Sequence, residues 1–178
     1  YDVTTGFSIA GRISTAEIDY NIQENSEQLG RDAERIIRSA GIGVGDYIAH
    51  KIAKVNEGFA AMHKSIYKQA KYWTSQGKRV AIVGGDHSVA LGAVKALAEC
   101  NEGLGVLFID AHADFSREDN IFNFSHRSIA CDIVEAVPSV AKLVQVGVRD
   151  VDIAEAEALR SNVKVDTFFA ERLMARRF

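Results

Sequence analysis

Two short clusters of histidine and aspartate have the residue types and the spacing of metal ligands. Asp110, His112 and Asp114 alternate with alanines, so on an extended backbone the three side chains point to the same side. His87, in the sequence Gly-Gly-Asp-His-Ser at 84–88, adds a second imidazole. Two imidazoles and two carboxylates without a thiolate favour Mn²⁺ over zinc–thiolate or iron–sulfur centres. Two such ions, about 3.5–4 Å apart, can activate a shared water for hydrolysis. The clusters therefore predict a metal-dependent hydrolase.

Each cluster directly follows an apolar run that is typical of a buried strand. Residues 80–83 precede the first cluster, and residues 105–109 precede the second. Ligands of open α/β sheets gather outside the carboxyl ends of parallel strands, so both clusters are expected to meet there. A lone histidine after a Gly-Gly turn is more commonly a loop residue. The pairing of two clusters at two strand ends is what favours the metal site.

Hydrophobic periodicity predicts strands that alternate with helices along most of the chain. We expect strands at 1–4, 78–83, 104–109, 142–148 and 163–165. We expect helices between Ser26 and Gly41, and at 47–75, 88–99, 126–137, 153–160 and from 169 onward. This alternation predicts an α/β fold with a mostly parallel sheet that is covered on both faces.

The remaining histidines differ in what their positions suggest. His126 lies at a predicted loop-to-helix junction, where an imidazole could transfer a proton to a leaving amine. The alternative is a capping or surface histidine. His50 and His63 fall within helical patterns and are given no role. Asp86 is expected either to anchor its turn or to orient His87.

Composition indicates an ordinary globular protein without a nucleic-acid or membrane surface. The 178 residues are 47% hydrophobic and 25% charged, with a net charge of −3. Cys100 and Cys131 have no CxxC partner, so we expect reduced packing residues in a cytoplasmic protein. The sequence starts at Tyr1 and contains one proline, Pro138, so we expect a fragment or a sequence that lacks some loops.

The motifs, taken in order, resemble those of the ureohydrolases, which include arginase and agmatinase. The resemblance rests on Gly-Gly-Asp-His-Ser at 84–88, Asp-Ala-His-Ala-Asp at 110–114, Ser-His at 125–126 and Val-Gly-Val-Arg-Asp-Val-Asp at 146–152. It implies a three-layer α/β/α arginase-like fold with a binuclear manganese centre. It also implies hydrolysis of a guanidino C–N bond and assembly into homotrimers or homohexamers.

Residue roles carried over from the resemblance give a candidate site. The implied manganese ligands are His87, Asp110, His112 and Asp114, with Asp110 bridging the two ions. His126 corresponds to the histidine that assists proton transfer. The implied substrate-binding positions are Asp152 and Glu155, near an α-amino group, and Ser116, where arginases carry asparagine. Arg127 replaces a small residue and could narrow the pocket or recruit a carboxylate.

One departure from the family pattern shapes the hypotheses. The family takes two further aspartate ligands from a later DxDxxDP-type motif, which this sequence does not contain. We therefore expect residues 1–178 to form a single arginase-like domain that is C-terminally incomplete and inactive alone. The complete protein is expected to hydrolyse a small guanidino compound such as arginine or agmatine, releasing urea through a metal-bound hydroxide. The alternatives are a non-catalytic metal-binding or regulatory relative, and a dimetal hydrolase of another bond such as an amide.

Overall fold

The computed structural model describes residues 20–39, 46–117 and 121–175, so the predicted strand at 1–4 lies outside the described residues. The helices are α1 (Tyr20–Ser39), α2 (Asp46–Ser75), α3 (Ala90–Cys100), α4 (Ile129–Ala136), α5 (Ile153–Ser161) and α6 (Ala170–Ala175). Short 3₁₀ turns, η1 (His87–Val89) and η2 (His126–Ser128), precede α3 and α4. The strands are β1 (Leu104–Ile109), β2 (Val140–Val148) and β3 (Val165–Phe169).

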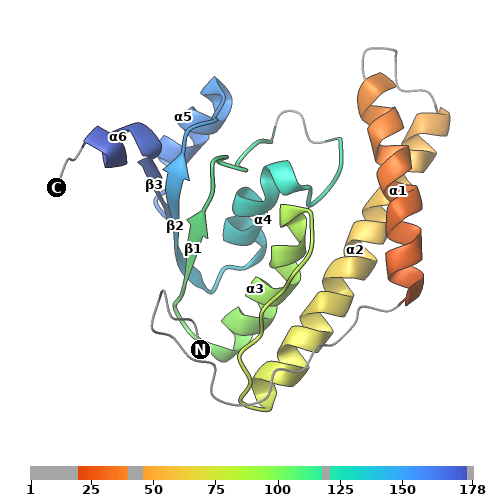
Figure 1. Cartoon of the computed structure of the whole chain (residues 1–178), viewed down its shortest axis with the longest axis horizontal. Coiled ribbons are helices and arrows are strands. Elements are labelled where there is room, and N and C mark those ends of the chain that lie inside the picture. The colour runs from red at the N-terminus through yellow and green to blue at the C-terminus, as the bar shows by residue number, and fades with distance from the viewer. Residues whose placement is uncertain (1–19, 40–45, 118–120, 176–178) are drawn as a thin grey trace, which may run out of the picture.

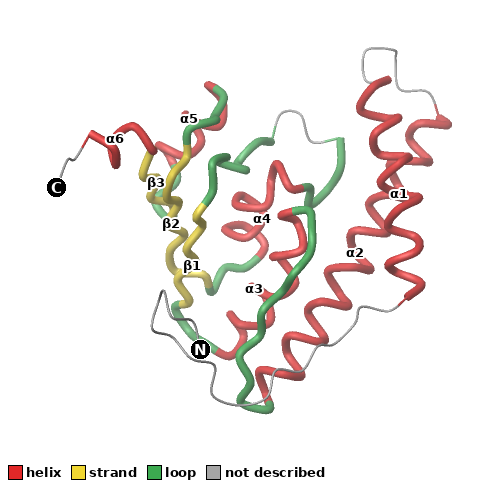
Figure 2. The backbone as a smooth tube through the Cα atoms, in the orientation of Figure 1, coloured by secondary structure: helices red, strands yellow, loops and turns green. Residues whose placement is uncertain are grey.

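The three strands form one parallel sheet in the order β1-β2-β3, so the predicted α/β fold with a parallel sheet is confirmed (Figure 2). Leu107 of β1 is paired with Val144 of β2, and Gln145 of β2 is paired with Thr167 of β3. Parallel strands need long crossovers, and α4 and α5 lie in the two connections between consecutive strands. The carboxyl ends of all three strands therefore lie at the same end of the sheet.

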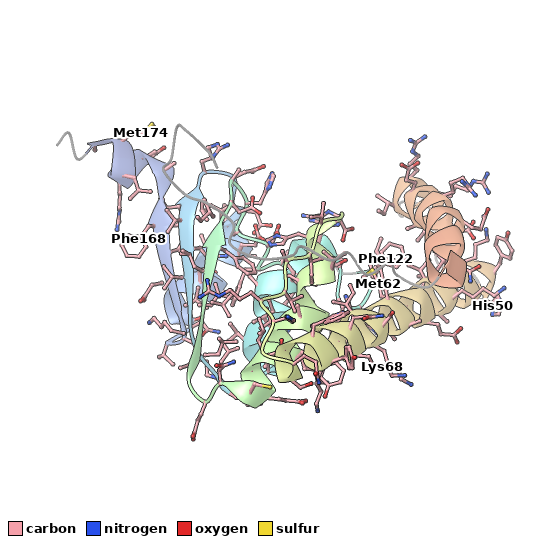
Figure 3. The ribbon with its side chains drawn as sticks, turned by 60° about the horizontal axis from the view of Figure 1, so that its bottom comes forward. His50, Met62, Lys68, Phe122, Phe168 and Met174 are labelled. Carbon is pink, nitrogen blue, oxygen red and sulfur yellow. The ribbon has the colours of Figure 1, made fainter. Side chains whose placement is uncertain are left out.

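Helices α3 and α4 lie between the sheet and the long helices α1 and α2 (Figure 1). The main core includes Phe108 and Leu143 from the sheet and Ile129 and Ile133 from α4. Helix α2 packs on α3 along its apolar stripe, and α1 packs on α2. A second small cluster joins Ile36, Val55 and Phe122, so Phe122 packs against α1 and α2 (Figure 3). Within the described residues, no helix has the length and apolar character needed to cross a membrane.

The opposite face of β1 is not covered by the described residues. Alternate residues of β1 face the core, but Leu107 is 61% exposed and Ile109 is 80% exposed. Helix α5 contacts β3, and α6 contacts β2 and β3. These two helices therefore lie towards the β3 edge of the sheet, away from β1. The sequence pattern predicted helices on both faces, and the described helices cover β1 on one face.

The strand predicted at 78–83 is not formed, although its apolar composition is that of a strand. Residues 78–84 make no ladder with any described strand and form an irregular segment between α2 and η1 that runs beside α3 (Figure 2). Val83 is 99% exposed, as expected of a segment without a neighbour. A strand is defined by hydrogen bonds to another strand, and a local apolar pattern cannot supply that partner. Element boundaries differ elsewhere by a few residues, and α2 continues unbroken through Gly58.

Gly92 sets the distance between α2 and α3. A Cβ at this position would lie 2.6 Å from the carbonyl oxygen of His63 and 3.0 Å from the amide nitrogen of Tyr67, both in the backbone of α2. Backbone atoms of a helix cannot rotate away as a side chain can. The absence of a side chain at Gly92 therefore permits the close crossing of the two helices, which also brings His63 up to the turn that contains His87.

We expect Gly92→Ala to destabilise the protein by about 1–3 kcal/mol, because overpacking outweighs the gain of about 1 kcal/mol in helix propensity. Urea unfolding would measure the change. Gly30→Ala on α1 is the matched control, because a Cβ there meets nothing within 4 Å, and it should be neutral or stabilising. Equal effects of the two substitutions would contradict the role assigned to Gly92.

Candidate metal centre

Three of the four predicted metal ligands converge on one point. Nδ1 of His87 lies 2.6 Å from Oδ2 of Asp114 and 3.3 Å from Oδ2 of Asp110. One possible ligand atom from each residue lies within 4.8 Å of those of the other two. The three residues come from η1, from the residue after β1 and from the loop that follows it. The two clusters meet as expected, but only Asp110 follows the end of a strand, because the strand predicted before His87 is not formed.

His112 lies on the other side of Asp110. Its amide nitrogen donates to Oδ1 of Asp110 at 3.0 Å, and its Nδ1 is 3.4 Å from the same oxygen. Its Nε2 is 3.7 Å from Oδ2 of Asp150, and an isolated bridge pairs the two backbones. The imidazole is exposed and stands outside the group of three. Asp110 consequently has one carboxylate oxygen towards each histidine.

Electrostatics in the cluster show a strong demand for positive charge. The hydrogen bond with Asp114 raises the pKa of His87, and nearby Asp110 and Asp86 act in the same direction. Burial opposes ionisation of Asp110, but the amide of His112 and the charge of His87 hold its pKa below the usual value. Two carboxylates thus share one imidazole. A divalent cation would satisfy the same carboxylates, so the donor set fits a hard or borderline metal such as Mn²⁺.

Asp86 organises the turn that carries His87. Its Oδ1 accepts hydrogen bonds from the amide of Ser88, at 3.1 Å, and from the Ser88 hydroxyl, which makes Asp86 the N-cap of η1. Its Oδ2 lies 3.2 Å from Nδ1 of His126. Although burial opposes ionisation, the bonds from His126 and Ser88 lower the pKa of Asp86 to about 2. Asp86 therefore anchors the turn, one of its two expected roles, and also joins it to η2.

His126 lies beside this turn, at the junction where the sequence placed it. The hydrogen bond with Asp86 raises the pKa of His126, and the charge of Asp114 adds to this effect. The imidazole is half exposed, and its Nδ1 faces Asp86, which leaves Nε2 on the other side of the ring. Its position near Asp86 and Asp114 is compatible with either proton transfer or a structural ion pair.

The three residues expected at the substrate lie around the loop 113–117. Ser116 is buried, and its amide donates to the carbonyl of Arg127 at 3.1 Å. Asp152 is the N-cap of α5, and its Oδ1 accepts from the amide of Glu155 at 2.7 Å. Glu155 accepts from the amide of Phe115 at 3.0 Å. Each of the three thus contributes to local backbone structure close to the predicted metal ligands.

His63 supports the site although its sequence position gave no reason to select it. The ring is buried on α2, where its Nε2 donates to the carbonyl of Ser88 at 3.0 Å. It stacks on Phe59, with ring centroids 6.2 Å apart, and meets Phe124 edge-on at 5.8 Å. His63 shares the apolar face of α2 with Ile66 and Ala70, which is the one signal that could have indicated a buried histidine.

Protonation of His63 should make the protein less stable in acid. Burial lowers the pKa of His63 below the ordinary 6.5, so the unfolded chain binds this proton at a higher pH than the folded chain does. Its contribution is complete above pH 6.5 and is lost as the pH falls towards the folded pKa, by about 1.4 kcal/mol per unit of difference. His63→Gln keeps a donor for Ser88 and does not titrate.

We expect the loss of unfolding free energy between pH 7.5 and pH 5.5 to be smaller in His63→Gln than in the wild type. Urea unfolding at both pH values would measure it. His50→Gln, at an exposed site on the same helix, should behave as the wild type does. An unchanged loss in His63→Gln would show that other groups set the acid sensitivity.

The comparisons with known proteins agree on one protein family. Residues 14–178 match the model of the arginase family. Arginase from Coccidioides posadasii is 32% identical over 135 residues, which are 64% of this chain and 42% of that protein. Arginase from Neurospora crassa is 28% identical and covers 64% of this chain and 38% of its own length. The chain thus spans about two fifths of the length of these relatives.

Solved structures show the same fold. Arginase from Medicago truncatula aligns with 80% of this chain and 41% of its own, with a TM-score of 0.57 and 25% identity. Arginase from Bacillus caldovelox aligns with 66% of this chain and 44% of its own, with a TM-score of 0.57 and 22% identity, which is a likeness of fold. Family match, fold and the convergence of His87, Asp110 and Asp114 lead to one conclusion: the chain belongs to the arginase family.

Proposed function

We propose that the complete protein is a manganese-dependent ureohydrolase that cleaves a guanidino C–N bond of a small molecule. The observation that carries the proposal is the convergence of His87, in η1, with Asp110 and Asp114, in the segment that follows β1. The parallel sheet is held by backbone hydrogen bonds and does not require two carboxylates and an imidazole at this point. The arginase-family match supplies the class of reaction. The proposal concerns the complete protein, because this chain spans only part of its relatives.

The donor set favours manganese over softer metals. Carboxylate oxygen and imidazole nitrogen are ligands that suit Mn²⁺, whereas thiolates would favour zinc or iron–sulfur centres. Cys131 is buried, and burial with a nearby Glu135 raises its pKa to about 11, so its thiol stays protonated. We propose His87, Asp110, His112 and Asp114 as ligands of two ions, with Asp110 between them. Further carboxylates from outside this sequence would complete the shell, and this chain alone would be inactive.

When bound, the two ions would act as Lewis acids and lower the pKa of a water towards neutrality. The protein residues have separate tasks. Asp110 lies between His87 and His112, with one oxygen towards each, which suits a shared ligand. Asp86 holds Nδ1 of His126 and raises the pKa of that ring. His126, with Nδ1 held by Asp86, would donate a proton from Nε2 to the departing amine.

Substrate recognition is proposed for residues in and beside the loop 113–117. Asp152 is exposed at the start of α5, where its carboxylate could meet a cationic amino group. Ser116 is buried and makes backbone contacts in the loop, so its contact with substrate stays a prediction. Arginine, agmatine and other guanidino compounds fit this description equally. A cytoplasmic homotrimer or homohexamer is part of the same proposal and follows from the family resemblance.

We expect the complete protein to bind two manganese ions per chain and to release urea from one compound of a guanidino panel. Metal analysis would give the stoichiometry, and a urea assay would give the activity. Removal of metal with a chelator should abolish urea release, and added Mn²⁺ should restore it. One ion or none, with no urea from any compound, would favour the non-catalytic relative. Hydrolysis of an amide instead would keep the dimetal centre and change the bond.

We expect His126→Asn in the complete protein to lower kcat about 10²–10⁴-fold, the contribution typical of general acid–base catalysis, while the manganese content stays near that of the wild type. Steady-state kinetics and metal analysis on the same preparations would test this. His50→Asn is the matched control, since His50 is exposed at the end of α2 that lies away from the sheet (Figure 3). Equal loss of metal and turnover in His126→Asn would assign His126 a structural role.

A further inference from the structure

Asp114 has a backbone conformation that needs support from its surroundings. Its φ is 49°, in the left-handed region that non-glycine residues rarely adopt. Aspartate tolerates this region better than most residues, but the conformation persists only where neighbouring contacts hold it. This conformation coincides with the 2.6 Å contact between the Asp114 carboxylate and His87. The contacts that fix the backbone of Asp114 therefore also fix the position of a proposed metal ligand.

Hydrogen bonds hold the loop on both sides of Asp114. The carbonyl of Asp114 accepts from the amide of Ala130 at 3.0 Å. On the preceding side, the carbonyl of Ala113 accepts from Nε2 of Gln145 at 2.5 Å. On the following side, the amide of Phe115 donates to Oε1 of Glu155 at 3.0 Å. Two of these partners are side chains from distant segments, one from β2 and one from α5.

The Glu155 carboxylate is itself fixed by a capping box. Its Oε2 accepts from the amide of Asp152 at 3.2 Å, and Oδ1 of Asp152 accepts from the amide of Glu155 at 2.7 Å. Both oxygens of Glu155 therefore accept backbone hydrogen bonds, one at the start of α5 and one in the metal-binding loop. A carboxylate bond to an amide is charge-assisted and stronger than a neutral one. This use of both oxygens differs from the substrate contact that the family resemblance implies.

Gln145 is fixed in the same way from the other side. It is fully buried at the middle of β2, and its Oε1 accepts from the hydroxyl of Thr167 on β3 at 2.9 Å. Because the hydroxyl donates to Oε1, Nε2 is the atom that faces Ala113. A buried amide with both ends bonded has one orientation. The sheet therefore fixes Ala113 through Gln145. Glu155, which holds Phe115, is less buried and is the residue that can be substituted with less damage to the core.

We propose that Glu155 is a positioning residue for the metal centre: together with Gln145, it holds Asp114 in the conformation that directs its carboxylate at His87 and Asp110. The presence of a metal in this inference rests on the proposed function. The hydrogen bond between Glu155 and Phe115 is independent of that function. Loss of Glu155 would let Phe115 and Asp114 relax towards the common backbone regions. The Asp114 carboxylate would then leave the point at which the three ligands meet.

Four variants of the complete protein separate this role from helix capping. Glu155→Ala removes both bonds, and Asp152→Ala removes the acceptor for the Glu155 amide but leaves the Glu155 side chain able to reach Phe115. Glu157→Ala removes an exposed carboxylate from the same helix and is the matched charge control. Glu155→Gln keeps an oxygen that can accept from Phe115 and serves as the conservative rescue. Mn²⁺ affinity and amide hydrogen exchange at Phe115 in the metal-free protein would be measured for each.

We expect Glu155→Ala to weaken Mn²⁺ binding about 10-fold or more, as loss of outer-shell partners does, and to speed exchange at Phe115. Glu155→Gln should recover most of both losses, and Glu157→Ala should match the wild type. Asp152→Ala should weaken metal binding less than Glu155→Ala, although both substitutions remove one side chain of the capping box of α5. Wild-type metal affinity in Glu155→Ala, or unchanged protection of Phe115, would overturn the inference.

The same experiment keeps the inference distinct from the proposed function. If the wild-type protein bound no Mn²⁺, the proposed function would fail, and exchange at Phe115 would still show whether Glu155 holds the loop. If Glu155→Ala did not fold, Glu155→Gln and Asp152→Ala would still decide the matter. A loss of Mn²⁺ affinity of about 10-fold or more in Asp152→Ala, with unchanged protection of Phe115, would overturn the positioning role and assign the effect to the helix cap.

Discussion

Parallel hydrogen bonding between β1 and β2 continues past the end of β1 and determines where the ligands of the candidate centre begin. The amide of Asp110 donates to the carbonyl of Val146 at 3.1 Å, and the carbonyl of Ala111 accepts from the amides of Arg149 and Asp150. Gly147 permits this close approach, because a Cβ there would lie 3.3 Å from the carbonyl oxygen of Asp110 and its φ is 93°. Asp110 is thus placed by the sheet itself, and the other proposed ligands are brought to it.

The other proposed ligands depend on contacts that are distant in sequence. Asp86 and His63 hold the turn with His87 from its own N-cap and from α2. Gln145 and Glu155 hold the loop with Asp114 from β2 and α5. Carboxylates placed this close repel each other, and a protonated imidazole or a cation offsets that repulsion. Much of the surrounding structure therefore maintains a cluster that is costly without a positive partner.

Residue types and spacing predicted the convergence of His87, Asp110 and Asp114 better than they predicted the contacts that support it. The alternation at 110–114 and the strand at 104–109 are local patterns, and both placed Asp110 correctly at a strand end. The prediction of a strand at 78–83 was wrong. A strand needs a hydrogen-bonded partner from a distant part of the chain, and a local pattern cannot show whether one is present. His63 resembled any other position on the apolar face of α2, since periodicity reports burial and not hydrogen bonding. The contact between Glu155 and Phe115 joins residues 40 positions apart, which no local pattern encodes.

The uncovered side of β1 has a consequence for handling the chain in solution. Within the described residues β1 is paired along one edge, and Leu107 and Ile109 project from it into solvent. An unpaired strand edge with apolar side chains is a template for adding strands from another molecule. Concentrated preparations of this chain would self-associate through β1 while its helices stay folded. Turbidity and light scattering, rather than circular dichroism, would then report the first loss of usable material.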